Sequence, residues 1–189
     1  MRTAYTATAD GAWLMLFLVW LPGYFAMRRT ARVGNPLLQI PGNILLVLAF
    51  ALLFSRTSLG PQAQVTPQTT AFGAGGLALN LAGVLFAIWA RLMLGRNWSG
   101  TIMQVKRDHQ LIQTGPYAIV RHPIYTGFLA AFLGSALTRG SLPAYLALVF
   151  ALGAVLIRVG LEEGLMRDTF GEAHAAWRRR TKRLIPFVW

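Results

Sequence analysis

Long runs of apolar residues alternate with polar connections along this chain of 189 residues. Five runs stand out, at about 11–27, 37–54, 72–94, 123–137 and 142–161. A helix rises about 1.5 Å per residue, so about 20 residues cross the hydrocarbon core of a bilayer. The fourth run is short for a crossing, and we expect its flanks, from Tyr117 and to Thr138, to complete it. The pattern predicts an all-α, polytopic membrane protein with about five transmembrane helices.

Two polar segments follow the third and the fifth runs. Residues 95–122 form a long connection that contains the turn signal Thr114-Gly115-Pro116. In residues 162–183, apolar side chains recur at steps of three and four residues, and most arginines lie outside this apolar stripe. The pattern predicts an amphipathic C-terminal helix. We expect a single membrane domain over 1–189, with the polar chemistry in its half 94–189.

The composition supports this assignment and excludes some kinds of site. Hydrophobic residues make up 55% of the chain and charged residues 13%, whereas a soluble domain carries about 25% charged residues. Cysteine is absent, which excludes a disulfide framework, a thiolate nucleophile and a cysteine-ligated metal. The three histidines do not have the spacing of a metal site, so no metal is expected.

Charge indicates the orientation. The formal net charge is +12, from 18 Lys and Arg against 6 Asp and Glu. The basic residues flank the apolar runs, so the positive-inside bias explains them better than nucleic-acid binding does. They cluster after the first, third and fifth runs, which predicts an external N-terminus and a cytoplasmic C-terminus. The Ala-, Leu- and Arg-rich composition indicates a bacterial inner membrane, and residues 162–183 would rest on its headgroups.

Candidate chemistry begins where the fourth helix starts. Proline is favoured in the first turn of a helix, as at His122-Pro123. The backbone N–H groups of such a helix start can bind an anion, and Arg121 and His122 add side-chain donors. The alternative is that Arg121 anchors the chain to headgroups and His122 caps the helix.

A second candidate is the pair Glu162-Glu163 at the end of the fifth run. Carboxylates at the inner edge of a membrane helix are costly unless they are paired or solvated. Adjacent side chains point about 100° apart on a helix, so we expect at most one to face a pocket shared with His122, and we favour Glu163. Alternatively, both are ordinary charges stabilised at the start of the C-terminal helix.

These pieces recur in a familiar order. The tripeptide RHP at 121–123 is followed by Tyr125 and Gly127, then by Glu162-Glu163, Phe170-Gly171-Glu172 and the run WRRR at 177–180. The order resembles that of the isoprenylcysteine carboxyl methyltransferase family, and residues 94–98 and 111–117 are similar to its prokaryotic branch. The RHP block alone also occurs in phospholipid N-methyltransferases and membrane sterol reductases.

The resemblance implies S-adenosylmethionine as methyl donor, bound at the cytoplasmic face between residues 104–125 and the C-terminal helix. Its carboxylate suits the helix start, its amine and ribose suit Glu163, and its adenine suits Leu111 and Ile112. The expected donor site comprises Gln104, Val105, His109, Leu111, Ile112, Gly115, Tyr117, His122, Pro123, Tyr125 and Glu163. The expected acceptor contacts are Arg121, Trp177 and Arg180, with Arg121 and Glu163 as the catalytic pair.

The acceptor itself stays open. A carboxylate acceptor needs a cation, for which Arg121 is the candidate, whereas a lipid amine needs a base such as Glu163. The resemblance has two departures: Thr181-Lys182 replaces a Val-Pro pair, and His174 replaces a tyrosine. An NADPH-dependent lipid or sterol reductase and a non-catalytic membrane protein are the alternatives from other classes.

Overall fold

The computed structural model describes residues 2–25, 30–33, 35–55, 64–95, 104–106 and 111–189. Five long helices dominate this part of the chain, together with two short strands and one 3-10 turn. In chain order they are α1 (Arg2–Phe25), β1 (Thr30–Val33), α2 (Pro36–Phe54), α3 (Thr70–Leu94), β2 (Gln104–Lys106), η3 (Gly115–Ala118), α4 (Pro123–Arg139) and α5 (Leu142–Arg180).

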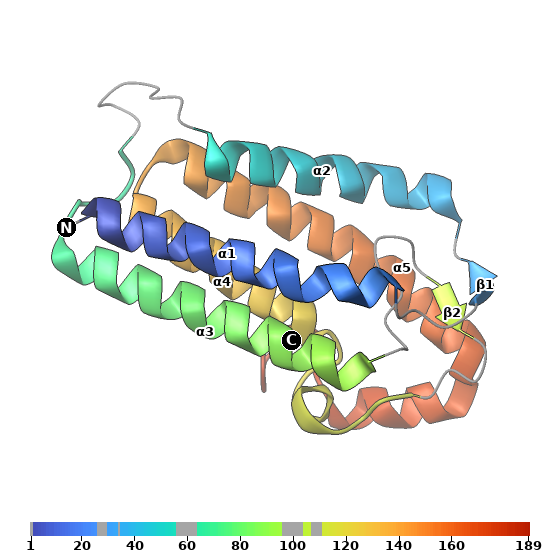
Figure 1. Ribbon diagram of the computed structural model, residues 1–189. Coiled ribbons are helices and arrows are strands. Elements are labelled where there is room, and N and C mark those ends of the chain that lie inside the picture. The colour runs from blue at the N-terminus through green and yellow to red at the C-terminus, as the bar shows by residue number, and fades with distance from the viewer. Residues whose placement is uncertain (1, 26–29, 34, 56–63, 96–103, 107–110) are drawn as a thin grey trace.

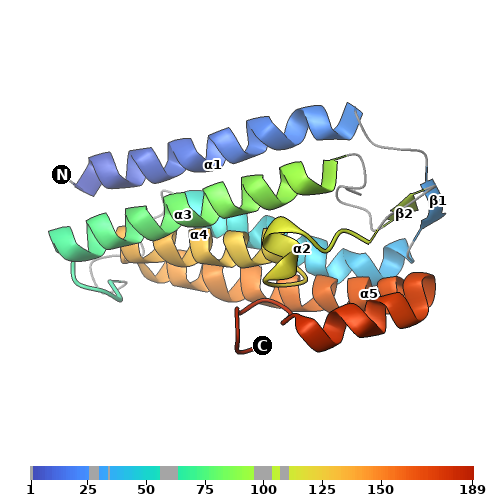
Figure 2. The same ribbon diagram turned by 90° about the horizontal axis from the view of Figure 1, so that it is seen from below.

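The helices run side by side as one bundle (Figures 1 and 2). The most extensive contacts join α3 to α4 and α2 to α5, and α1 packs mainly on α3. One end of the bundle carries β1 and β2, and we call it the sheet end. At the opposite end α4 passes into α5 at Gly140, whose carbonyl accepts the backbone N–H of Val65 at 2.7 Å.

Glycines let α3 and α4 approach each other closely. A Cβ on Gly134 of α4 would lie 2.3 Å from the backbone nitrogen of Asn80, and one on Gly127 would lie 2.5 Å from the carbonyl oxygen of Gly83. Such small-residue contacts replace the hydrophobic driving force that helices lack in lipid. Nearby, Asn80 and Trp13 both donate hydrogen bonds to the buried Ser135 hydroxyl, each at 3.0 Å.

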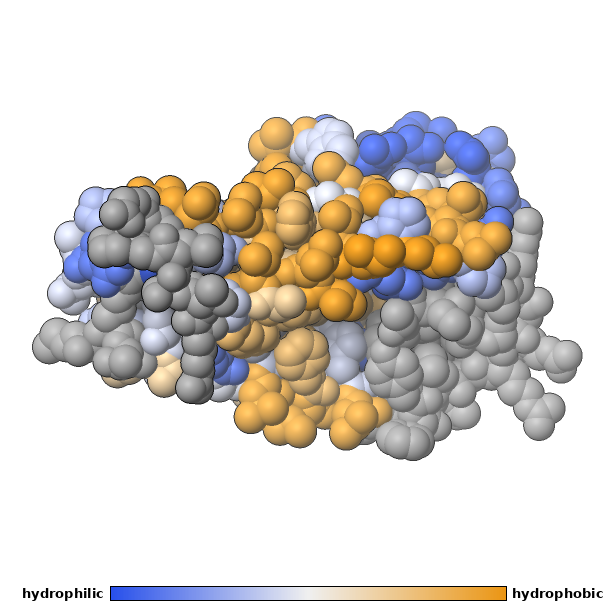
Figure 3. Space-filling model, turned by 90° about the horizontal axis from the view of Figure 1, so that it is seen from above, coloured by the Kyte–Doolittle hydropathy of each residue, from blue (hydrophilic) through white to orange (hydrophobic). Residues whose placement is uncertain are grey.

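Four helices are long and apolar enough to cross a membrane, namely α1, α2, α3 and α5. On the face that Figure 3 shows, hydrophobic residues cover the middle of the bundle and hydrophilic residues lie towards its ends. The fourth predicted run forms α4, which has 17 residues. Our expectation that residues from Tyr117 onward would lengthen it is wrong, because Tyr117 lies in η3 and the helix begins at Pro123.

The C-terminal helix begins later than the sequence indicated. Helical structure continues through Glu162 to Phe170, and the break falls at Gly171, where φ is 48° and ψ is −119°. A residue with a side chain rarely adopts this conformation, so glycine fixes the position of the bend. A helix of 39 residues would be about 58 Å long, twice the thickness of the hydrocarbon core. Residues 172–180 therefore lie beyond the spanning part and fold back along the bundle (Figure 2).

The two-stranded sheet was not predicted. β1 follows α1 and pairs antiparallel with β2, with Arg32 opposite Val105 and Val33 opposite Gln104. Strands this short carry no periodicity that a sequence could show. The pairing ties the α1–α2 connection to the segment that precedes η3.

Candidate functional site

A buried ion-pair cluster at the sheet end centres on Glu163, whose exposed fraction is 8%. Its Oε1 atom accepts a hydrogen bond from Arg121 Nε at 2.6 Å and lies 3.1 Å from His122 Nε2. Its Oε2 atom lies 3.4 Å from Arg178 Nε. Cations from the start of α4 and from the end of α5 therefore surround one carboxylate, as a charge this far from water requires.

His122 contacts both neighbouring carboxylates. Its Nδ1 lies 3.3 Å from Glu162 Oε2, while its Nε2 faces Glu163. The Tyr125 hydroxyl donates to Glu162 Oε1 at 2.5 Å. Our expectation that at most one glutamate would face His122 is wrong, because the two ring nitrogens point in different directions and reach side chains about 100° apart.

The charge state of His122 follows from these contacts. Burial alone would lower the pKa of His122, but the hydrogen bonds and negative charges of Glu162 and Glu163 outweigh that effect and raise it. An imidazolium between two carboxylates is the state that this arrangement stabilises. Burial also raises the pKa of the neighbouring Tyr117 hydroxyl well above its ordinary value, so that group stays neutral.

The raised pKa of His122 predicts a pH-dependent stability. A group with a raised folded-state pKa stabilises the fold fully below its unfolded pKa of about 6.5, and the effect is lost as the pH rises through the folded value. The melting temperature of the wild type in detergent should exceed that of His122→Gln most near pH 6, and the difference should shrink towards pH 9. A difference that grows with pH would contradict a charged His122.

The C-terminal segment 181–184 covers the start of α4. The carbonyls of Lys182 and Arg183 accept the backbone N–H groups of Arg121 and His122, at 2.8 and 3.1 Å. The Thr181 carbonyl accepts Arg121 Nη1 at 2.5 Å. The C-terminal segment therefore binds N–H groups that precede the first turn of α4, and one nitrogen of the Arg121 side chain expected to bind an anion here. Backbone carbonyls make these contacts, so the contacts do not depend on the Thr181 and Lys182 side chains, at which the sequence departs from the pattern of the resemblance.

The helix after Gly171 packs on the segment that contains η3. Trp177 is buried and donates its Nε1 hydrogen to the Tyr117 carbonyl at 3.1 Å, and Leu111 and Ile112 pack against the same cluster. Gly115 sits at a φ of 60°. Arg180, which is exposed, donates to Gln113 at 3.0 Å. Trp177 thus anchors this helix to the segment that contains η3.

The structure brings together four of the predicted residues: Arg121, His122, Tyr125 and Glu163. Pro123 begins α4 next to them. Gln104 and Val105 lie in β2, where one edge of the strand pairs with β1. His109 lies outside the described residues.

Sequence reasoning missed two members of the cluster, Glu162 and Arg178, and one buried histidine of the C-terminal helix. The sequence favours Glu163 over Glu162 as the residue that faces His122, whereas Glu162 also contacts His122, and Tyr125 as well. Arg178 was counted among the basic residues of an amphipathic helix. His174 was noted as a departure from the family, yet it is fully buried, with an exposed fraction of 1%. The available signal for His174 was a histidine in a helix that is rich in arginine and was expected to lie at the surface.

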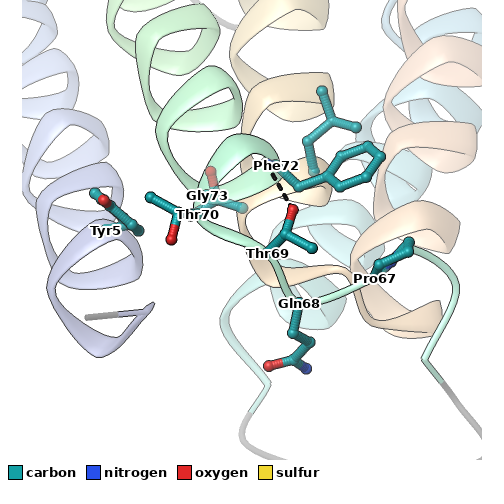
Figure 4. A pocket seen from close by; sticks show the side chains of 9 residues that line it. Tyr5, Pro67, Gln68, Thr69, Thr70, Phe72 and Gly73 are labelled. Atoms are coloured by element: carbon teal, nitrogen blue, oxygen red, sulfur yellow. Dashed lines mark hydrogen bonds between the residues drawn. The ribbon is translucent and has the colours of Figure 1, made fainter.

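No group of metal ligands occurs among the described residues. A small cavity of about 80 Å³ lies at the opposite end of the bundle, between Tyr5, Thr69 and Leu137 (Figure 4). The Thr69 hydroxyl there accepts the backbone N–H of Phe72. Sites for drug-sized ligands are usually 300–1,000 Å³, so this cavity does not compete with the cluster as a functional site.

Comparison with known proteins gives three further findings. The profile of the phospholipid methyltransferase family matches residues 72–173. The protein-S-isoprenylcysteine O-methyltransferase of Schizosaccharomyces pombe is 29% identical over 101 residues, which cover 52% of this chain and 43% of that protein. The methanethiol S-methyltransferase 1 of Bradyrhizobium diazoefficiens is 39% identical over 74 residues, 38% of this chain and 24% of that protein.

The fold is also similar to a solved structure. The eukaryotic intramembrane Ras methyltransferase ICMT (isoprenylcysteine carboxyl methyltransferase) superposes with a TM-score of 0.54 at 24% sequence identity, covering 77% of this chain and 52% of that one. The chain spans about half the length of the curated relatives that it matches first.

Proposed function

The chain belongs to the phospholipid methyltransferase family, and from this premise we propose that it transfers a methyl group from S-adenosylmethionine to an amphiphilic acceptor. The observation that carries the proposal is the buried Glu163 carboxylate held between Arg121 and His122. Both of these residues belong to the RHP block that the family resemblance rests on, and Glu163 lies within the matched residues 72–173.

The cluster fits the charged end of the donor. Glu163 Oε2 is buried and makes no hydrogen bond within the described residues, so it can accept one from an ammonium group. The half-exposed Arg178 lies beside the same oxygen and can pair with a carboxylate. When bound, S-adenosylmethionine supplies a methyl group activated by a positively charged sulfur.

The role of the chain is then to bind and to align. Arg121 and His122 fix Glu163 Oε1 from two sides, and Oε2, which lies beside Arg178, is the atom that we assign to the ligand. Alignment of the reacting atoms supplies most of the acceleration in a direct displacement. We therefore propose Arg121 as a positioning residue for Glu163, in place of the acceptor contact that the resemblance implied.

For the acceptor we propose a carboxylate. Cations around Glu163 favour its ionised form and make it a weak base, whereas a carboxylate acceptor is already deprotonated at neutral pH. With Arg121 engaged, the exposed Arg180 is the cation that we assign to it. The alternative is a lipid amine, which would need a base.

We propose the orientation from the charge pattern, with the sheet end and the C-terminus in the cytoplasm, where the donor is made. Reporter fusions at Trp189 should read as cytoplasmic, and those near Gln64 should read as external. An external reading at Trp189 would place the candidate site on the opposite side of the membrane from the donor and would contradict the proposal.

Ligand binding separates the proposal from the reductase alternative. Purified protein in detergent should bind S-adenosylhomocysteine in titration calorimetry and should not bind NADPH. Binding of NADPH without S-adenosylhomocysteine would contradict the proposed function.

A further inference from the structure

A short apolar segment, residues 184–189 with the sequence LIPFVW, follows the end of α5. The exposed fraction is 90% for Phe187, 70% for Val188 and 53% for Ile185. Phe187 also has a φ of 65°, a conformation that a bulky residue rarely adopts. A turn that only reversed the chain would favour glycine there. The segment therefore directs large apolar side chains outward, one of them from a position where an aromatic residue is conformationally costly.

This segment lies against the membrane-spanning helices. The buried Leu184 side chain packs with Val155 and Val159, which belong to the apolar run of α5. The Leu184 carbonyl accepts a hydrogen bond from the Thr126 hydroxyl of α4 at 2.7 Å. The C mark accordingly lies alongside the bundle in both ribbon views (Figures 1 and 2). The exposed apolar side chains therefore extend a surface that spanning helices present to lipid.

The backbone of the segment is folded on itself in a way that suits a surrounding poor in water. The N–H groups of Leu184 and Ile185 both donate to the Trp189 carbonyl, at 2.9 and 2.7 Å. Those of Val188 and Trp189 both donate to the Ile185 carbonyl at 3.1 Å. Pro186 has no N–H group to satisfy. Backbone donors that are bonded internally can approach acyl chains at little cost, whereas unpaired donors cannot.

Basic residues flank the apolar turn. Arg179, Arg180 and Lys182 are exposed, and the Arg183 guanidinium lies 5.5 Å from the centroid of the Trp189 ring. Anionic headgroups attract such cations, and tryptophan favours the boundary between headgroups and acyl chains. A second copy of this chain would bring the same positive charge to the contact. The charge and the apolar turn together therefore fit an anionic bilayer.

We propose that residues 184–189 are an interfacial anchor, which enters the anionic leaflet at the sheet end and holds the start of α4 in position. The link is the preceding backbone, because the carbonyls of Lys182 and Arg183 accept the N–H groups of Arg121 and His122. Lipid that binds the anchor thereby orders the first residues of the RHP block. This role depends on neither the methyl donor nor the acceptor.

Spin labels test where the anchor lies, and a chain without cysteine accepts them one position at a time. Phe187→Cys and Val188→Cys carry the label in vesicles of phosphatidylethanolamine and phosphatidylglycerol. The control is Glu172→Cys, at an exposed position beyond the spanning part. Labels at 187 and 188 should collide more with oxygen, which concentrates in lipid, than with a water-soluble nickel chelate. The order should reverse at 172.

Two results of this experiment would overturn the inference. If the nickel chelate reaches positions 187 and 188 as readily as position 172, the turn lies in water. If both reagents are excluded from 187 and 188, a protein surface covers the turn, from a second copy or another partner, and lipid is not its ligand.

Phe187→Gly tests the link from the anchor to α4. Glycine adopts a φ of 65° readily, so the variant keeps the turn and loses the apolar side chain. In the same vesicles, hydrogen exchange at the Arg121 and His122 amides should become about tenfold faster, the usual effect of one weakened hydrogen bond. Phe187→Trp should keep the wild-type rate. Equal rates in the wild type and Phe187→Gly would show that the anchor does not hold the start of α4.

Discussion

Glu163→Gln should weaken the binding of S-adenosylhomocysteine by about tenfold to a hundredfold and reduce methyl transfer at least as much. The substitution keeps the size of the side chain and removes its charge. A hydrogen bond to a charged group contributes about 1.5–3 kcal/mol, and each 1.4 kcal/mol is a factor of ten. Calorimetry and a labelled-methyl assay on the purified protein measure the two effects.

The matched control is Glu172→Gln, at an exposed glutamate nine residues after Glu163 in the chain. Both its affinity and its turnover should stay within about twofold of the wild type. Unchanged affinity in a folded Glu163→Gln protein would show that Glu163 is not a donor contact, and the site would have to lie elsewhere.

Arg121→Gln should lower both stability and donor affinity. Removing one partner of a buried ion pair costs about 3–5 kcal/mol, because the remaining charge is left unpaired. Here Glu163 would lose its 2.6 Å contact, and the Thr181 carbonyl would lose its donor. Arg121→Lys should recover little, since one ammonium group cannot reproduce the two directions of a guanidinium fork. Chemical denaturation and calorimetry provide the readouts.

The double variant Arg121→Gln/Glu163→Gln separates folding from binding. Replacing both charges removes the unpaired one, so stability should recover relative to either single variant. Donor affinity should not recover, because the carboxylate is still missing. If Arg121→Gln instead keeps its donor affinity and loses turnover alone, Arg121 contacts the acceptor, as the family resemblance implied.

The apolar runs predicted most of the fold. Their lengths and spacing located all five helices, and α2 begins and ends within one residue of its run. The sequence places the end of the fifth helix at Leu161, because the hydrophobic pattern stops there. In the structure α5 stays helical past that residue, and its backbone bends at Gly171. The end of a hydrophobic run indicates where the membrane-spanning part ends. The helical backbone itself can continue into water beyond that point.

The site was predicted in part. The RHP block and Glu163 could be chosen because buried charge at a membrane edge needs a partner. The contact of His122 with both glutamates depends on the orientation of one ring, which no spacing reveals. The burial of His174 depends on the fold-back after Gly171, so a side chain that the local pattern places in water is buried against Trp177.

Methyl transfer from labelled S-adenosylmethionine tests the central claim most directly. The purified protein is incubated with membrane lipids and with a prenylcysteine acceptor that carries a free carboxylate, and the products are treated with mild base. We predict label in the amphiphilic fraction that base releases as methanol, the behaviour of a methyl ester, and no such label with Glu163→Gln. Base-stable label would indicate an amine acceptor, and the absence of label from a protein that binds the donor would contradict the account.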